Sequence, residues 1–155
     1  MIERKILCFS LSGGQVNYYL MYHPKSHSKG NTVRDKNIIV LTCRVRPGES
    51  VSNYVLRGFI DALLNKSEGS NFLLQNYIFL VIPMMNPDGV FFGNWRCNLT
   101  GGDISCQWKN PDKWINPEYY YLMKLIRKLV DNNNKIVDFI DFRGSVGEKQ
   151  GYYLS

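Results

Sequence analysis

The residues that most readily bind metals or act as nucleophiles are few in this chain of 155 amino acids, which holds two histidines and four cysteines. The histidines, His23 and His27, stand four positions apart and could together clip a metal ion. No Cys, Asp or Glu is spaced nearby to complete the ligand set that such a site needs. An ordinary surface loop is therefore the favoured interpretation of this segment.

The cysteines form no CxxC pair, so the sequence predicts reduced, mostly buried thiols rather than a disulfide framework or a zinc ribbon. Cys97 and Cys106 bracket a long irregular segment. Either would be reactive, or would bind a metal, if Arg96 lowered its thiol pKa. Buried and inert thiols are the more usual case, and we favour that interpretation. The other two cysteines are Cys8 and Cys43.

Composition indicates one folded domain spanning residues 1–155. The chain is 45% hydrophobic and 14% aromatic, and its 19 Lys and Arg against 13 Asp and Glu give a formal net charge of +6. No apolar run approaches the roughly 18–20 residues of a membrane span, and Met1–Lys5 does not open a signal peptide. We therefore expect a cytoplasmic protein with no membrane partner.

A cluster of aromatic residues accompanies the irregular segment. These side chains could line a base-stacking or peptide groove, or could pack into the core beneath a long loop. We favour core packing and expect no nucleic-acid partner. The residues are Phe91, Phe92, Trp95, Trp108 and Trp114.

Two continuous apolar runs, 38–43 and 77–82, have the pattern of strands covered on both faces. Apolar residues at helical spacing between Val51 and Leu64 predict a helix between them, which makes a βαβ unit with parallel strands. Ahead of this unit, 6–11 and 16–22 predict a hairpin, followed by a polar loop over 24–37.

The C-terminal half is predicted from the same signals. Residues 84–114 show no sustained period and predict a long irregular segment, the kind that is usually functional. Asn116 and Pro117 then start a helix that runs to Val130, and 136–142 is a third buried-type strand. A fourth strand begins at 151–154. The predicted fold class is mixed α/β, with a largely parallel central sheet and flanking helices.

Four fragments occur in the order and spacing found in the zinc carboxypeptidases of the cytosolic type, the tubulin deglutamylase-like metallocarboxypeptidases. They are RVRPGES (44–50), VIPMMNPDGV (81–90), GNWRCNLTG (93–101) and DFRG (141–144). The chain resembles that family over nearly all of its length. The resemblance implies a carboxypeptidase-like fold that is incomplete at the C-terminus, so that this chain is its front portion only.

In that family a His-Pro-Gly-Glu loop and a later Phe-His-Gly histidine hold one Zn²⁺. The resemblance places Arg46 and Arg143 at the two histidine positions and leaves Glu49 as a vestigial ligand. A guanidinium is always protonated and has no lone pair to offer a metal. We therefore expect no cofactor.

The resemblance also assigns the substrate-binding positions. The family's Asp-x-Asn-Arg run, whose last two residues grip the substrate carboxylate, is substituted here by Ser105 and Cys106. Arg96 matches the arginine that polarises the scissile carbonyl, and Asp103 matches the aspartate that orients the first histidine. The catalytic glutamate of the family would lie beyond Ser155.

Charge balance suggests what replaced the metal. Two arginines and two carboxylates neutralise one another, so we expect Arg46 and Arg143 to pair with Glu49 and Asp103 in the neighbourhood of the zinc position. Together with Arg96, this group either retains a pocket for an acidic peptide or is a relic held by salt bridges. The relic is the favoured interpretation of the two.

These expectations combine into a catalytically inactive carboxypeptidase-like domain, a pseudoenzyme, that binds acidic protein tails such as the glutamate-rich tails of tubulin. One alternative is an active cytosolic metallocarboxypeptidase that removes C-terminal or side-chain glutamates from tubulin-like substrates. A second alternative is a non-functional partial gene product, with an exposed sheet edge that makes it unstable.

Overall fold

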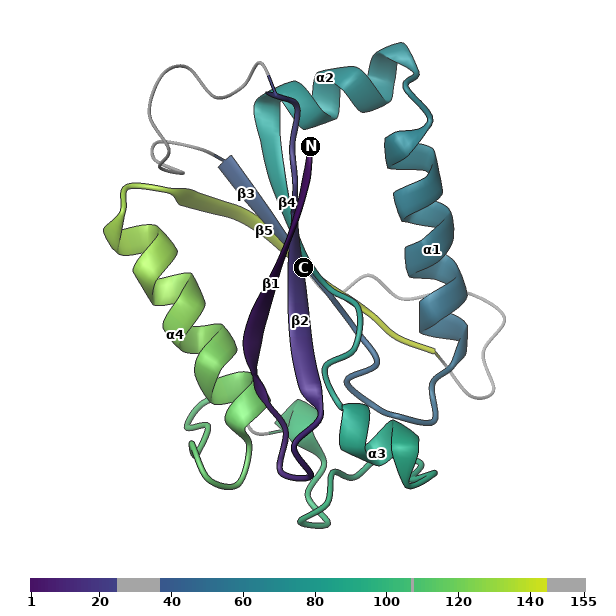
Figure 1. Ribbon diagram of the computed structural model, residues 1–155, viewed down its shortest axis with the longest axis vertical. Coiled ribbons are helices and arrows are strands. Elements are labelled where there is room, and N and C mark those ends of the chain that lie inside the picture. Colours follow the sequence, from purple (N-terminus) through teal and green to yellow (C-terminus); the bar gives the residue numbers. More distant parts are fainter. Residues whose placement is uncertain (25–36, 107, 145–155) are drawn as a thin grey trace.

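The computed structural model describes residues 1–24, 37–106 and 108–144, which form a five-stranded sheet with helices on both faces (Figure 1). Nearly all of the predicted 24–37 loop, with His27, lies outside the described residues. The strand predicted at 151–154 lies outside them as well.

The sheet confirms the predicted fold class. β3 pairs in parallel with both β4 and β5, whereas β2 runs antiparallel to β1 and β4, in the order β1-β2-β4-β3-β5. The hairpin and the parallel βαβ unit are therefore both present. The strands are β1 (Ile2–Phe9), β2 (Gln15–Met21), β3 (Asn37–Cys43), β4 (Tyr77–Ile82) and β5 (Lys135–Phe142).

Two of the helices are those that the periodicity predicts, α1 (Val51–Leu64) and α4 (Pro117–Asp131). The prediction missed α2 (Glu68–Asn76), between α1 and β4, and it treated as irregular a segment that contains α3 (Pro87–Phe91) and the short 3₁₀ helix η2 (Ile104–Cys106). These elements are short, so their apolar periodicity is weak and capping decides where they begin.

The helices cover both faces of the sheet, α4 on one and α1 with α2 on the other (Figure 1). Successive side chains of β3 therefore enter different cores, as strand geometry requires. Each fully buried aliphatic side chain contributes about 1.5–3 kcal/mol. The α4 side includes Ile38, Val40, Tyr119 and Leu122, and the α1 side includes Leu41, Cys43, Leu56 and Leu63.

Parallel pairing brings the carboxyl ends of β3, β4 and β5 to one edge of the sheet. The loops that follow these strands must therefore start close together, and such an edge is where ligands bind in open α/β sheets. None of the helices in the described ranges is long and apolar enough to cross a membrane.

Candidate functional site

The loop after β3 begins with an unusual backbone conformation. Arg44 has a φ of +54°, in the left-handed region that non-glycine residues rarely adopt. The loop is fastened to the segment after β4, because the Met85 amide donates to the Cys43 carbonyl at 3.0 Å and Asn86 Nδ2 donates to the Val45 carbonyl at 3.4 Å. These bonds fix the direction in which Arg46 leaves the sheet.

The Asn-Pro-Asp-Gly run forms the first turn of α3 rather than a free turn. Asn86 Oδ1 accepts from the Gly89 amide at 2.9 Å, which caps the helix. Gly89 faces the β3 loop so closely that a Cβ there would lie 2.6 Å from Pro47 Cγ and 2.8 Å from the Cys97 carbonyl oxygen. Only glycine allows this approach.

Asp88 of the same run ties α3 to the β1–β2 hairpin. Its carboxylate accepts from both the Ser10 and Ser12 hydroxyls at 2.5 Å and from the Ser12 amide at 3.0 Å. The motif quoted above for the family resemblance therefore has a structural role here, because it holds three segments against one another.

Trp95 packs directly on the β3 loop. A Cβ on Gly48 would lie 2.3 Å from the Trp95 ring, and the Gly48 amide donates to the Trp95 carbonyl at 2.9 Å. This contact brings the 93–101 segment over the loop that carries Arg46 and Glu49.

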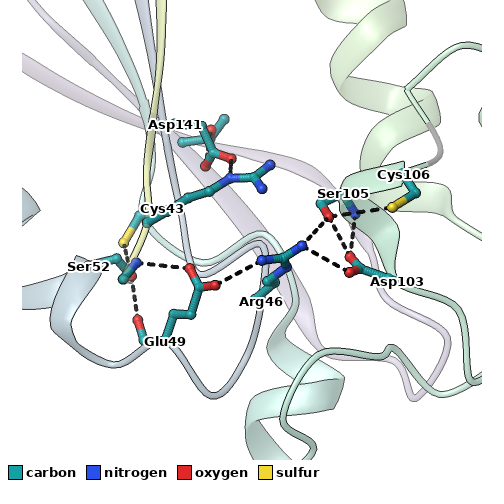
Figure 2. Close-up of polar contacts among 11 residues, drawn as sticks. Cys43, Arg46, Glu49, Ser52, Asp103, Ser105, Cys106 and Asp141 are labelled. Atoms are coloured by element: carbon teal, nitrogen blue, oxygen red, sulfur yellow. Dashed lines mark hydrogen bonds and ion pairs between the residues drawn. The ribbon is translucent and has the colours of Figure 1, made fainter. Parts of the chain in front are cut away.

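Arg46 bridges two carboxylates at this edge of the sheet, as Figure 2 shows. Its Nη1 lies 3.4 Å from Glu49 Oε1, and its Nη2 lies 3.3 Å from Asp103 Oδ2 and 3.4 Å from Ser105 Oγ. The Arg46 and Glu49 side chains are 22% and 9% exposed, so solvent screens this interaction only in part. The predicted pairing of Arg46 with both carboxylates is therefore found.

Asp103 is held in its charged form by its neighbours. Burial raises its pKa, but hydrogen bonds from the Ser105 hydroxyl and amide, at 2.6 and 2.9 Å, and the Arg46 guanidinium outweigh burial, so the net pKa is lowered. Cys106 follows with its Sγ 3.9 Å from Ser105 Oγ. Ser105 thus forms hydrogen bonds with both Arg46 and Asp103.

Arg143 does not pair as expected. Its Nε donates to Asp141 Oδ2 at 2.6 Å, and the structure gives it no ion pair with Glu49 or Asp103. Arg143 directly follows β5 and stands two positions beyond Asp141, so the alternation of the strand brings both side chains to the same side. Glu49 Oε2 instead accepts from the Gly144 amide at 2.9 Å.

The Arg143–Asp141 pair gives the cluster a third carboxylate that the sequence analysis did not include. Burial raises the pKa of Asp141, although Arg143 and a 2.9 Å hydrogen bond from the Thr42 hydroxyl oppose the rise. For Arg143, burial lowers the pKa, but Asp141 more than compensates and the net pKa is raised. Two guanidiniums therefore face three carboxylates here.

Tyr119 is a second residue that the sequence analysis missed. Its side chain is fully buried and its hydroxyl has no hydrogen-bond partner among the described residues. Burial, with the nearby Asp141 carboxylate, raises its pKa well above the usual value. The sequence indicates only that Tyr119 lies in the first turn of the helix, next to Glu118.

Arg96 stands apart from the cluster. It is exposed, and within the described ranges it takes part in no hydrogen bond or ion pair. The predicted site residues that the structure brings together are Arg46, Glu49, Asp103, Ser105 and Cys106, with Arg143 beside them.

The cysteine and aromatic predictions are correct only in part. Cys8 and Cys43 are buried, but Cys97 is half-buried and Cys106 is exposed, and all four are free thiols. Trp108 packs as predicted, with its ring 4.2 Å from Tyr119 and 5.2 Å from Phe139. Core packing is the wrong interpretation for the other four, which are exposed because they lie at loop and helix ends: Phe91, Phe92, Trp95 and Trp114.

The residues present do not fit a zinc ion. Zinc needs three protein donors with free lone pairs, and Arg46 and Arg143 provide none. The two oxygens of Glu49 are engaged by Arg46 and by the Gly144 amide. Among the described residues no three His, Cys, Asp or Glu side chains are grouped so that they could hold a metal.

Comparison with known proteins agrees with the fold and the motifs. Residues 4–144 match the zinc carboxypeptidase family. Cytosolic carboxypeptidase 6 of Caenorhabditis elegans is 45% identical over 98 residues, which are 63% of this chain and 21% of that protein. Human cytosolic carboxypeptidase 4 is 35% identical over 155 residues, 98% of this chain and 14% of that protein.

Among solved structures, a metallo-carboxypeptidase of Burkholderia cenocepacia shares the fold, with a TM-score of 0.78 and 22% identity over 93% of this chain and 37% of that chain. The mixed five-stranded sheet, with helices on both faces, and the family match over residues 4–144 define the class. The chain belongs to the zinc carboxypeptidase family. It spans between about a tenth and a fifth of the length of the curated relatives it matches.

Proposed function

We propose that this chain is a catalytically inactive zinc-carboxypeptidase-like domain, a pseudoenzyme, that binds acidic protein segments in the cytoplasm. The claim of catalytic inactivity rests on the Arg46 bridge to Glu49 and Asp103. A guanidinium at that position repels a cation, and its own salt bridges occupy the carboxylate that a zinc ion would use.

The claim that the chain binds acidic segments rests on its net positive charge and on the family resemblance. The chain has a net charge of +6 and a sequence pI of about 9.2, which favours acidic partners. The family resemblance suggests glutamate-rich tails such as those of tubulin, and the relatives that are named cytosolic support the compartment. The proposal includes no nucleic-acid or membrane partner.

Metal analysis of the purified chain, combined with an activity assay, tests the catalytic half. We expect zinc well below one equivalent and no release of glutamate from a polyglutamylated peptide. One tightly bound zinc, with glutamate release that a chelator abolishes, would instead establish the alternative of an active metallocarboxypeptidase.

A thermal unfolding experiment separates the proposal from a non-functional product. A folded binding domain of this size should unfold in one cooperative transition. Aggregation without such a transition would support the alternative in which the exposed edge of the sheet makes the chain unstable.

A further inference from the structure

A hollow beside α4, away from the Arg46 cluster, gathers positive charge that nothing in the described structure neutralises. The loop that leads into α4 forms one wall and the outer face of the helix forms the other, and Figure 1 shows this loop at the N-terminal end of α4. The hollow measures about 530 Å³, within the range of roughly 300–1,000 Å³ typical of ligand pockets. Its lining is Lys109, Asn110, Pro111, Asp112, Tyr120, Met123, Lys124 and Arg127.

Helical spacing places the α4 side chains on one wall. Tyr120 and Lys124 are four residues apart and Lys124 and Arg127 are three apart, so all three share a face of the helix. Lys109 stands on the opposing loop. The hollow is thus flanked by cations on both sides, with the half-buried Tyr120 and Met123 between them.

These cations are not paired within the described ranges. Ion pairs there involve other basic residues, and Lys109, Lys124 and Arg127 have no carboxylate within 4.0 Å. The single acid of the lining, Asp112, already accepts from the backbone amides of Trp114 and Ile115, at 2.7 and 3.1 Å. The charge of the hollow is therefore available to a partner.

The aromatic residues near the hollow favour a peptide over a nucleic acid. Stacking of bases needs an open ring face. Tyr120 is the only aromatic side chain in the lining, and its ring meets Tyr121 edge to face at 5.3 Å. The neighbouring Trp114 is exposed but is not part of the lining, and the Lys113 ammonium lies 4.8 Å from its ring centroid.

We propose that this hollow, the α4 groove, binds an acidic polypeptide segment through Lys109, Lys124 and Arg127. The inference deepens the proposed function and rests on it only for the role of acidic segments as ligands. It moves the main contact from the Arg46 cluster, where carboxylates outnumber guanidiniums, to a surface where cations lack partners.

Fluorescence anisotropy with a labelled oligoglutamate peptide tests the inference on the full chain. We expect saturable binding that weakens with added salt, and no binding of the matched oligoglutamine peptide. The double variant Lys124→Gln with Arg127→Gln should lose about tenfold in affinity, because it removes two ion pairs with the peptide. Lys109→Gln, on the opposing wall, should weaken binding in the same direction.

The matched control removes two exposed cations elsewhere, Arg57→Gln with Lys135→Gln, and should bind within about twofold of the unchanged chain. Equal losses in both double variants would overturn the inference, because net charge alone would then explain binding. A single-stranded oligonucleotide that displaces the peptide from the groove at equal concentration would overturn the assignment to a peptide.

A third double variant, Arg96→Gln with Arg143→Gln, separates the two proposals. Loss of binding there, with full binding by the α4 groove variant, would overturn the groove and keep the proposed function. Stoichiometric zinc with glutamate release, alongside a groove variant that binds weakly, would overturn the proposed function and keep the groove. No binding of oligoglutamate by the unchanged chain would overturn the groove and the binding half together, leaving the metal analysis to decide catalysis.

Discussion

Basic side chains gather both at the sheet edge and in the α4 groove, and the two regions differ in what surrounds this charge. At the sheet edge, the guanidiniums of Arg46 and Arg143 lie within 3.4 Å of carboxylates and are partly withdrawn from solvent. In the α4 groove, Lys124 and Arg127 are exposed and have no carboxylate partner among the described residues. Charge in the first region organises loops, whereas charge in the second is available for binding.

The largest effect is expected from a double substitution that would turn the Arg46 cluster into a metal site. Arg46→His with Arg143→His would place two imidazoles beside Glu49 and supply the three donors that zinc requires. We expect about one equivalent of zinc by mass spectrometry of the native protein. Arg57→His with Arg143→His is the control and should bind none; equal metal content in both would show that the loops do not present the ligands together.

Glu118 is a buried carboxyl group with no cation beside it among the described residues. Burial raises its pKa from 4.5 to about 7, and Asp88 adds to the rise. Its Oε2 has no partner among the described residues. A pKa raised in the folded state means that protonated Glu118 supports folding at low pH, and that this support is lost as pH rises through about 7.

Glu118→Gln should therefore leave the free energy of unfolding unchanged near pH 4 and raise it by about 3 kcal/mol near pH 9. Urea unfolding of the variant and the unchanged chain at both values measures the difference. A variant that is equally stable or less stable at the higher pH would contradict the assignment of an uncompensated carboxylate.

Arg46→Met tests whether the paired charge is structural. Removal of the guanidinium leaves Glu49 and Asp103 partly buried without their cation, which should lower the free energy of unfolding by about 2 kcal/mol. Arg57→Met is the matched control, because Arg57 makes an exposed pair with Asp61 and should cost at most about 0.5 kcal/mol. Equal costs in urea titrations would remove the distinction between paired and exposed charge.

The smallest effect is expected in the groove. Lys124→Gln with Arg127→Gln should change the free energy of unfolding by no more than about 0.5 kcal/mol, because neither residue supports a described salt bridge. The midpoint of thermal unfolding measures this directly. A marked fall in stability would mean that the groove cations hold the fold, and the comparison between the regions would no longer stand.

The long, strongly periodic elements could be predicted from sequence. The βαβ unit and α4 follow from apolar spacing, whereas α2 was missed because its sequence is mostly polar and follows what looks like a turn. The available signal was Ser67, whose hydroxyl accepts from the Ser70 amide at 3.1 Å and caps the helix.

Only those site residues that belong to the sequence motifs could be predicted. The Arg46 bridge could be predicted because the strand ends bring Arg46 close to two carboxylates whose charge it can balance. The partner of Arg143 depends on strand alternation, which places Asp141 on the same side, and charge balance does not include that geometry. Exposure of the four loop aromatics depends on which loops cover which faces, and no local pattern carries that information.

The double engagement of Arg46 also constrains the order in which substitutions can accumulate here. A single Arg46→His removes the cation from Glu49 and Asp103 at neutral pH, while Arg143 still denies zinc its third ligand. The chain that carries only Arg46→His thus loses the salt bridges without gaining a metal ion. A path to a metal site that begins with Arg46→His therefore passes through a less stable intermediate, whereas a path that begins with Arg143→His keeps the Arg46 bridge.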